Sequence, residues 1–159
     1  MNKAESHIVI DAPVEKVWEV LADFGNVYRW APTVTKSYST SKNNSGQDAS
    51  RHCDVAGFGS IEETVTEWND GQKFEYSFTG AGPISGGYSS WSVKAQGDKT
   101  VVYTTLRYGV RFGPIGSLMN ALIIRRKLRQ SLATTLEGLK HHVKTGEQIG
   151  TDFRPLVAA

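Results

Sequence analysis

GPIGSLMNALIIRRKLRQSLATTLEGLKHHVKTG, residues 113–146, is the segment that decides the fold of this chain. It has the only apolar pattern long enough for a dominant helix, whereas residues 34–109 are typical of strands. A long helix and a large antiparallel sheet must bury their apolar faces against each other. If they touch everywhere, the protein has a solid core; if they stand apart, they enclose a pocket. The sequence therefore predicts an α+β protein whose function depends on the space between helix and sheet.

The predicted helix carries two apolar stripes. One lies in its second half, at Leu128, Leu132, Leu136, Leu139 and Val143. The other lies in its first half, at Ile115, Leu118, Met119, Leu122 and Ile123. At about 100° per residue the two stripes are offset by roughly a quarter turn, and the basic run Arg125-Arg126-Lys127 lies at the change. We expect the second half to pack flat on the sheet and the first half to lie over a hollow or an edge.

The chain opens with a strand and a helix. Ile8-Val9-Ile10 is a short apolar run, and Pro13 then suits the first turn of a helix, because its missing N–H would be unpaired there anyway. One face of that helix carries Val14, Val17, Trp18 and Leu21. Residues 27–30 predict a second short helix. It ends before Pro32, because the residue that precedes a proline avoids the helical region.

Residues 34–109 alternate between turn-forming clusters and runs rich in Thr, Val, Tyr, Phe and Trp. The turn clusters include Asn43-Asn44-Ser45-Gly46, Asn69-Asp70-Gly71 and Gly80-Ala81-Gly82-Pro83. Closely spaced turns with no helical segment between them predict an antiparallel meander. We expect six strands, at about residues 34–41, 48–56, 59–68, 73–80, 85–96 and 100–109.

Length and composition fit one globular domain with a sizeable core: 159 residues, 39% hydrophobic and 21% charged. A net charge of +2 is too small to indicate nucleic-acid binding. No apolar run approaches the length needed to cross a bilayer, and Met1–His7 lacks the apolar region of a signal peptide. The single cysteine, Cys53, excludes an internal disulfide. We therefore expect a cytoplasmic protein.

Several segments carry a pattern that goes beyond periodicity. Ile10–Phe24 passes from a strand into a helix, and Trp30-Ala31-Pro32 follows it. Others lie within the predicted sheet: Arg51-His52-Cys53, Glu62–Trp68, Phe74-Glu75-Tyr76 and Trp91-Ser92-Val93. With the order of elements, they resemble the helix-grip fold of the START-like, Bet v 1-like and polyketide cyclase/dehydrase-like proteins, the SRPBCC superfamily. The resemblance covers about residues 5–145 and is specific for fold, since members bind or transform very different ligands.

The resemblance implies a seven-stranded curved antiparallel sheet, in the order β-α-α-β6-α, wrapped around the long C-terminal helix with a central cavity. Residues 1–146 would form this domain. Residues 147–159 would form a loosely held tail with few apolar side chains: Ile149, Phe153, Leu156 and Val157.

The inner face of that sheet would carry a mixture of charged and apolar residues: Arg51, Cys53, Glu63, Tyr76 and Phe78. A solid core would not place an arginine and a glutamate there, since burying unpaired charge is costly. A pocket lined by aromatic side chains with a few polar groups suits a small amphipathic ligand. We therefore expect these residues to contact a ligand.

Three of these residues are also candidates for catalysis. Glu63 would orient a ligand or act as an acid or base. The alternatives are that Glu62 points inward instead, or that Glu63 forms a structural ion pair with Arg51. The same two interpretations apply to Arg51 as the natural partner. Tyr76 would present its hydroxyl to the ligand, although tyrosine is also common on inner sheet faces.

Other candidates for ligand binding lie elsewhere in the chain. Trp30 lies where the family has a loop at the pocket mouth, and is either a lid residue or a core anchor. Tyr103 would present a hydroxyl, but alternation leaves open which face of strand 100–109 points inward. Met119, Leu122 and Ile123 either line the cavity or belong to an ordinary core.

The remaining reactive residue types favour ordinary structural roles. Cys53 is more typical of a small buried hydrophobe than of a nucleophile, since no histidine is placed near it by the pattern. No spacing of His, Cys or Asp indicates a metal site, and we expect no cofactor. Arg125-Arg126-Lys127 is either a contact for phosphate or an anionic lipid surface, or a solvated face.

The sequence favours the binding of a small hydrophobic or amphipathic ligand, which would be lipid-, polyketide- or aromatic-like, in a central cavity. One alternative is an enzyme of the polyketide cyclase/dehydrase type, in which Glu63, Arg51 or Tyr76 would move protons. Another is a lipid or quinone carrier acting at a membrane, supported by the basic run and the apolar tail. The ligand, the presence of any reaction, and the choice between monomer and homodimer stay open.

Overall fold

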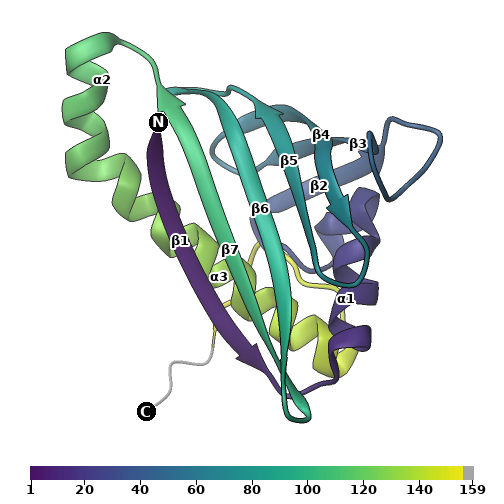
Figure 1. Cartoon of the computed structure of the whole chain (residues 1–159). Helices are drawn as coiled ribbons and strands as arrows, with labels where there is room; N and C mark the ends of the chain where they lie inside the picture. The colour runs from purple at the N-terminus through teal and green to yellow at the C-terminus, as the bar shows by residue number, and fades with distance from the viewer. Residues whose placement is uncertain (156–159) are drawn as a thin grey trace.

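One antiparallel sheet contains all the strands of residues 1–155, the part of the chain that a computed structural model describes. The strand order is β1-β7-β6-β5-β4-β3-β2, so the first and last strands pair and β1 and β2 form the edges. The sheet curves around the long helix (Figure 1). The strands are β1 (Asn2–Ile10), β2 (Val34–Ser39), β3 (Ser50–Val55), β4 (Gly59–Asn69), β5 (Lys73–Thr79), β6 (Ile84–Gln96) and β7 (Lys99–Val110).

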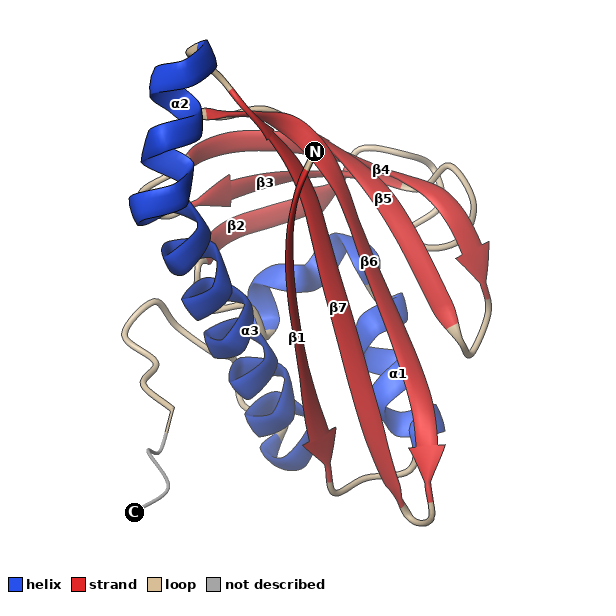
Figure 2. Cartoon of the chain, turned by 60° about the vertical axis from the view of Figure 1, so that its left-hand side comes forward, coloured by secondary structure: helices blue, strands red, loops and turns tan. Residues whose placement is uncertain are grey.

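Helical segments lie on the concave side of this sheet and at one end of it (Figure 2). The helix α1 (Val14–Ala22) and the 3₁₀ helix η1 (Phe24–Arg29) connect β1 to β2. The C-terminal helix has three parts: α2 (Gly113–Met119), the π-helical turn η2 (Asn120–Ile124) and α3 (Arg125–Thr145). The predicted α+β helix-grip fold, with seven strands and a long C-terminal helix, is thus confirmed.

The second short helix begins earlier than the sequence predicted, at Phe24. The ring of Phe24 is buried against Phe74 and Tyr76, with centroids 5.9 and 5.5 Å apart. The next residue, Gly25, donates its backbone N–H to Asn44 Oδ1 at 2.9 Å. These contacts with distant residues hold a helical turn where the local sequence, rich in turn-forming residues, predicts only a break.

The second half of the long helix packs closely only towards its C-terminal end. The prediction that all of it packs flat on the sheet is wrong, because Leu128 and Leu132 line open space between α3 and the sheet. Leu136, Leu139 and Val143 are buried in the main core. Gly138 lies so close to the segment before β2 that a Cβ there would be 2.4 Å from the carbonyl oxygen of Trp30. A glycine at this position therefore permits the close approach of the helix.

The first half of the helix follows a different course. At the π turn Asn120 is buried, accepts a hydrogen bond from the Tyr108 hydroxyl at 2.6 Å and donates one to Asn2 Oδ1 at 3.0 Å. Beyond this anchor α2 projects past the sheet (Figures 1 and 2), and Gly116 is its buried residue. The two halves of the helix do differ in their packing, as predicted, but the boundary between them is the π turn and not the basic run that follows.

The described part of the tail, residues 147–155, is held at one point. Ile149 is buried and donates its backbone N–H to the carbonyl oxygen of Arg29 at 2.8 Å. The expectation of a loosely held tail is therefore wrong at Ile149, because its side chain adds to the core. Leu156 and Val157 lie outside the described residues. None of the described helices is both long and apolar enough to span a bilayer.

Candidate ligand-binding cavity

Two adjoining chambers lie between the concave face of the sheet and α3, with volumes of about 140 and 120 Å³. Both are lined by Val55, Ile61, Glu63, Tyr76 and Leu106. The first chamber extends towards the start of α3 and is completed by Phe58, Phe78, Ile84, Tyr108, Leu128 and Ser131. The second extends towards η1, and its further lining includes Trp30, Arg51, Cys53, Phe74, Ser89, Trp91, Leu132 and Thr135.

Arg51 and Glu63 form a buried ion pair in the wall of the cavity. They are direct partners in the register of β3 with β4, so the two side chains leave the sheet side by side. Arg51 Nε donates to Glu63 Oε2, and Nη1 donates to the carbonyl oxygen of Phe24 at 2.6 Å. Each residue is 5% exposed. Mutual pairing and an added hydrogen bond are what buried charges require.

Aromatic rings enclose the guanidinium group of Arg51. Its central carbon lies 3.8 Å from the ring centroid of Phe24 and 5.0 Å from that of Tyr76. Burial alone would lower the pKa of Arg51. The negative charge of Glu63, smaller contributions from Cys53 and Tyr76, and the hydrogen bond to Glu63 together outweigh burial, so the net pKa lies above its ordinary value. The arginine therefore stays charged in the cavity wall.

Cys53 and Tyr76 flank the ion pair as neutral groups. The Cys53 thiol donates to Glu63 Oε2 at 3.4 Å, and burial raises the pKa of that thiol above its ordinary value. Burial, with the nearby charge of Glu63, raises the pKa of Tyr76 to about 12. Near neutral pH both groups keep their protons. This agrees with the interpretation of Cys53 as a small buried residue and not a nucleophile.

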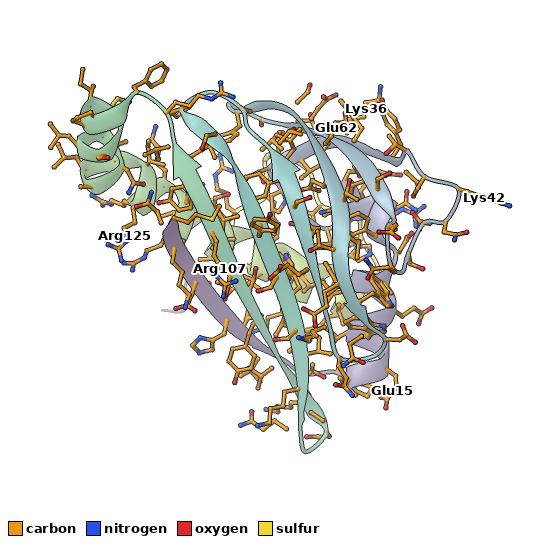
Figure 3. All side chains as sticks on the ribbon, turned by 45° about the horizontal axis from the view of Figure 1, so that its top comes forward. Glu15, Lys36, Lys42, Glu62, Arg107 and Arg125 are labelled. Atoms are coloured by element: carbon orange, nitrogen blue, oxygen red, sulfur yellow. The ribbon has the colours of Figure 1, made fainter. Side chains whose placement is uncertain are left out.

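The predicted facing of β3, β4 and β5 is confirmed. Arg51, Cys53, Glu63 and Tyr76 are buried on the cavity side, and the half-buried Phe78 lines the first chamber. Glu62 does not replace Glu63: it lies on the outer face, where it pairs with His52, and Figure 3 shows it at the surface. Glu63 is thus both the structural partner of Arg51 and a cavity-lining group.

Trp30 is a buried wall residue. Its ring packs edge-on against Trp91, with centroids 5.4 Å apart, and it lines the second chamber. At 4% exposure it serves as the predicted core anchor. The alternative of a lid residue is not supported, because the ring is enclosed by the core and not placed at the surface.

The cavity-lining prediction for Tyr103 is wrong. In β7 the inner face carries Val102, Thr104, Leu106 and Tyr108, whereas Tyr103 is 45% exposed and stacks on His7 of β1 at 5.8 Å between centroids. Alternation left this strand ambiguous because apolar residues occur on both faces. The outward residues gain their packing from the neighbouring edge strand.

The cavity-lining prediction for Met119, Leu122 and Ile123 is also wrong. Their side chains are 39%, 68% and 50% exposed, and none of them lines either chamber. Asn120 and Ile124 take the buried positions of the π turn instead. The apolar stripe of the first half therefore faces away from the sheet.

The sequence pattern missed several wall residues. Tyr108 was hidden by the ambiguity of its strand, and Phe58 lies in the turn between β3 and β4, where side-chain direction has no simple period. Ser131 and Thr135 of α3 are polar and therefore fall outside the apolar stripe. The signal that identifies them is their spacing of three residues from Leu128 and Leu132, which places them on the same face of the helix.

The described residues contain no group of His, Cys, Asp or Glu side chains that could hold a metal ion. The cavity wall itself offers hydrogen-bonding side chains, one ion pair and apolar surface. These groups can desolvate and orient a small molecule.

Comparison with known proteins agrees with this architecture. A family model described as "Polyketide cyclase / dehydrase and lipid transport" matches residues 1–144. A search of curated proteins found no match. The crystal structure of TTHA0849 from Thermus thermophilus superposes with a TM-score of 0.76 at 18% identity, over 91% of this chain and 99% of that one.

Two further structures show the same fold. A START superfamily protein from Mycobacterium smegmatis has a TM-score of 0.74 at 15% identity, over 89% of this chain and 97% of that one. The di-domain ARO/CYC protein BexL of the BE-7585A biosynthetic pathway has a TM-score of 0.71 at 18% identity, over 91% of this chain and 47% of that one. At such identities the structures establish the fold alone, but the family match spans nearly the whole sequence. The chain belongs to the polyketide cyclase/dehydrase and lipid transport family.

Proposed function

We propose that this chain binds a small, mostly apolar molecule in the two-chambered cavity, and that Arg51, Glu63 and Tyr76 orient its polar group. The observation that carries the proposal is the buried ion pair facing a largely apolar space. Apolar walls would remove ligand surface from water, at about 25 cal/mol per Å². The polar groups would select among ligands of similar shape.

Cavity size limits the ligand. A dry cavity of about 150 Å³ holds a molecule the size of benzene, and pockets for larger ligands span roughly 300–1,000 Å³. Each chamber, at about 140 or 120 Å³, is of the former size. The proposal is therefore a ligand with one ring or a short acyl chain in each chamber. A long lipid or a folded polyketide chain would need the walls to move apart.

The unused hydrogen-bonding capacity of the wall indicates the polar group of the ligand. Arg51 has five N–H donors, and its bonds to Glu63 and Phe24 use two of them. The bonds to Glu63 from Arg51 and Cys53 both end on Oε2, so Oε1 has no hydrogen-bond partner among residues 1–155. The neutral hydroxyl of Tyr76 is a further donor. Together these groups suit a ligand in which a carbonyl or carboxylate lies next to a hydroxyl. The donors of Arg51 and Tyr76 would bind the carbonyl or carboxylate, and Glu63 Oε1 would accept from the hydroxyl.

The alternative of a polyketide cyclase/dehydrase-type enzyme gains less support. Acid–base catalysis is best served by titratable groups on both sides of a substrate. Arg51, Glu63 and Tyr76 come from adjacent strands and form one wall. The facing wall on α3 presents Leu128, Ser131, Leu132 and Thr135, none of which moves protons readily. A lipid or quinone carrier would use the same cavity and add a surface for a membrane.

Native mass spectrometry of the protein purified from its own host tests the proposal. We expect a retained small molecule with an apolar body and an oxygen-containing polar group. Ser131→Phe would fill the first chamber and displace it, while Ala133→Phe, exposed on the same helix, is the matched control. Full occupancy in the Ser131→Phe variant would contradict the proposal. So would a protein that carries no small molecule and binds none from a set of aromatic and short acyl acids.

Substitution of Glu63 separates binding from catalysis once the ligand is known. A binder should tolerate Glu63→Gln with a modest loss of affinity, whereas an enzyme should lose turnover and still bind. Because Glu63 also pairs with Arg51, thermal unfolding must show that the variant is folded. Tyr76→Phe, which leaves the ion pair intact, provides a second variant for the same comparison.

A further inference from the structure

The projecting part of the C-terminal helix carries an unexplained apolar surface. Six large side chains gather there, each between 39% and 71% exposed, and we call this set the α2 tip: Phe112, Ile115, Leu118, Met119, Leu122 and Ile123. They are six of the eleven exposed large hydrophobic residues of the described chain. Soluble proteins rarely collect so many in one place without a binding partner.

The α2 tip is held in a fixed orientation. Gly116, Asn120 and Ile124 are the buried residues of α2 and η2, and Asn120 is anchored by the Tyr108 hydroxyl at 2.6 Å. Ile124 and Tyr108 share a small core cluster with Ala4 and Ile84. The apolar side chains of the tip lie off this buried line. Repacking onto the sheet would break the Tyr108–Asn120 bond.

Basic residues flank the α2 tip in the sequence. We call the exposed cations on either side of it in the sequence the basic collar: Arg111, Arg125, Arg126, Lys127 and Arg129. No Asp or Glu occurs between Arg111 and Glu137, although the whole chain has a net charge of only +2. Figure 3 shows Arg125 beside the projecting helix, at the other end of the molecule from Lys36 and Glu62.

Part of the basic collar forms a concave site. A groove of about 360 Å³ lies between Ala121, Arg125, Arg126, Arg129 and Gln130. Guanidinium groups bind phosphate oxygens through paired hydrogen bonds. Ala121, which lines the groove, precedes Leu122 of the tip, so a phosphate group bound there would lie on the same helix within about one turn of the tip.

We propose that the α2 tip and the basic collar dock on an anionic phospholipid bilayer, with the apolar side chains entering the acyl boundary and the arginines contacting headgroup phosphates. An exposed apolar face next to a dense cluster of cations is the combination that such a surface binds. A second copy of the chain is a poorer occupant, because a two-fold contact would bring two basic collars together. Nucleic acid is also a poorer occupant, because its phosphates would pair with the basic collar but the apolar side chains of the tip would stay exposed to water.

Docking would also orient the ligand cavity. Leu128 follows the basic collar residue Lys127 and lines the first chamber. The chamber would therefore lie close to the membrane surface. The docking inference itself does not depend on what the cavity binds, because vesicle binding can be measured without a ligand.

Sedimentation with lipid vesicles tests the inference on the full chain. We expect binding to vesicles of phosphatidylcholine mixed with phosphatidylglycerol, little binding to phosphatidylcholine alone, and a decrease in binding as salt is raised. Arg125→Glu/Arg126→Glu should weaken binding at least about 30-fold, since each cation near an anionic surface contributes roughly fivefold. Leu118→Ser/Leu122→Ser should weaken it at least about tenfold, through the loss of buried apolar area.

Matched controls keep the result specific. Lys94→Glu/Lys99→Glu makes the same change of charge at exposed sites near the β6–β7 turn, and it should bind nearly as the wild type does. Arg125→Lys/Arg126→Lys should retain most of the binding. The inference would be overturned if the wild-type protein did not bind anionic vesicles at low salt. It would also be overturned if Arg125→Glu/Arg126→Glu and Lys94→Glu/Lys99→Glu lost vesicle binding equally. A lipid-free dimer that Leu118→Ser/Leu122→Ser converts to a monomer would also overturn it, because the tip would then be a protein interface.

Discussion

The cavity wall and the α2 tip depart from the usual distribution of side chains in opposite directions. In the wall, β3 and β4 bury an arginine and a glutamate at 5% exposure. At the tip, large apolar side chains stay exposed beside a basic collar. Arginine and glutamate are seldom buried unless paired, and large apolar surfaces seldom stay uncovered. The charges in the wall pair with each other, so their burial is part of the fold. The apolar side chains of the tip have no partner within the described chain, so their exposure indicates a partner outside it.

The largest expected effect comes from breaking the internal pair. Arg51→Met leaves the carboxylate of Glu63 buried without its cation, which should lower the free energy of unfolding by about 3–5 kcal/mol. Urea unfolding of the variant beside the wild type measures this. The double variant Arg51→Met/Glu63→Met should recover most of the loss, because apolar residues of similar volume can replace a buried pair. A loss below about 1 kcal/mol in the single variant would show that the pair is better solvated than its burial indicates.

The two apolar stripes of the long helix should respond differently to the same substitution. Leu139→Ala removes a fully buried side chain and should cost about 2–5 kcal/mol. Leu122→Ala, at the α2 tip, should change stability by less than about 0.5 kcal/mol. Chemical unfolding under identical conditions provides the comparison. Equal costs would mean that the tip is packed in solution, and the contrast between the two regions would disappear.

Most of the fold could be predicted from the sequence, because strand alternation, turn residues and the long apolar pattern all indicate the same architecture. The errors occur where distant contacts override local signals. The start of η1 depends on Phe24 packing against β5, which no local pattern contains. The π turn depends on Asn120, whose amide meets Tyr108 and Asn2. A polar residue inside a helix gives no hint of such partners.

The candidate site likewise contains residues that the sequence could predict and residues that it could not. Arg51, Glu63 and Tyr76 could be predicted because alternation with a period of two fixes the facing of a strand once one residue is assigned. Met119, Leu122 and Ile123 could not, since an apolar stripe shows that a face avoids water without showing what covers it. Helical periodicity is the same for a core, a cavity wall and an external docking face.

The smallest expected effect is a dependence of stability on alkaline pH that originates in the cavity wall. In the folded protein the pKa of Tyr76 is raised from 10.0 to about 12, so between these values the folded state keeps a proton that the unfolded chain has lost. The free energy of unfolding should therefore fall as pH rises from 10 towards 12, by at most about 2.7 kcal/mol. Burial also raises the pKa of the Cys53 thiol, which adds a loss that begins at lower pH. Urea unfolding at a series of pH values should show a shallower decline for Tyr76→Phe than for the wild type. Parallel declines would mean that Tyr76 ionises as easily in the folded protein as in water, and the wall beside the ion pair would then be open to solvent.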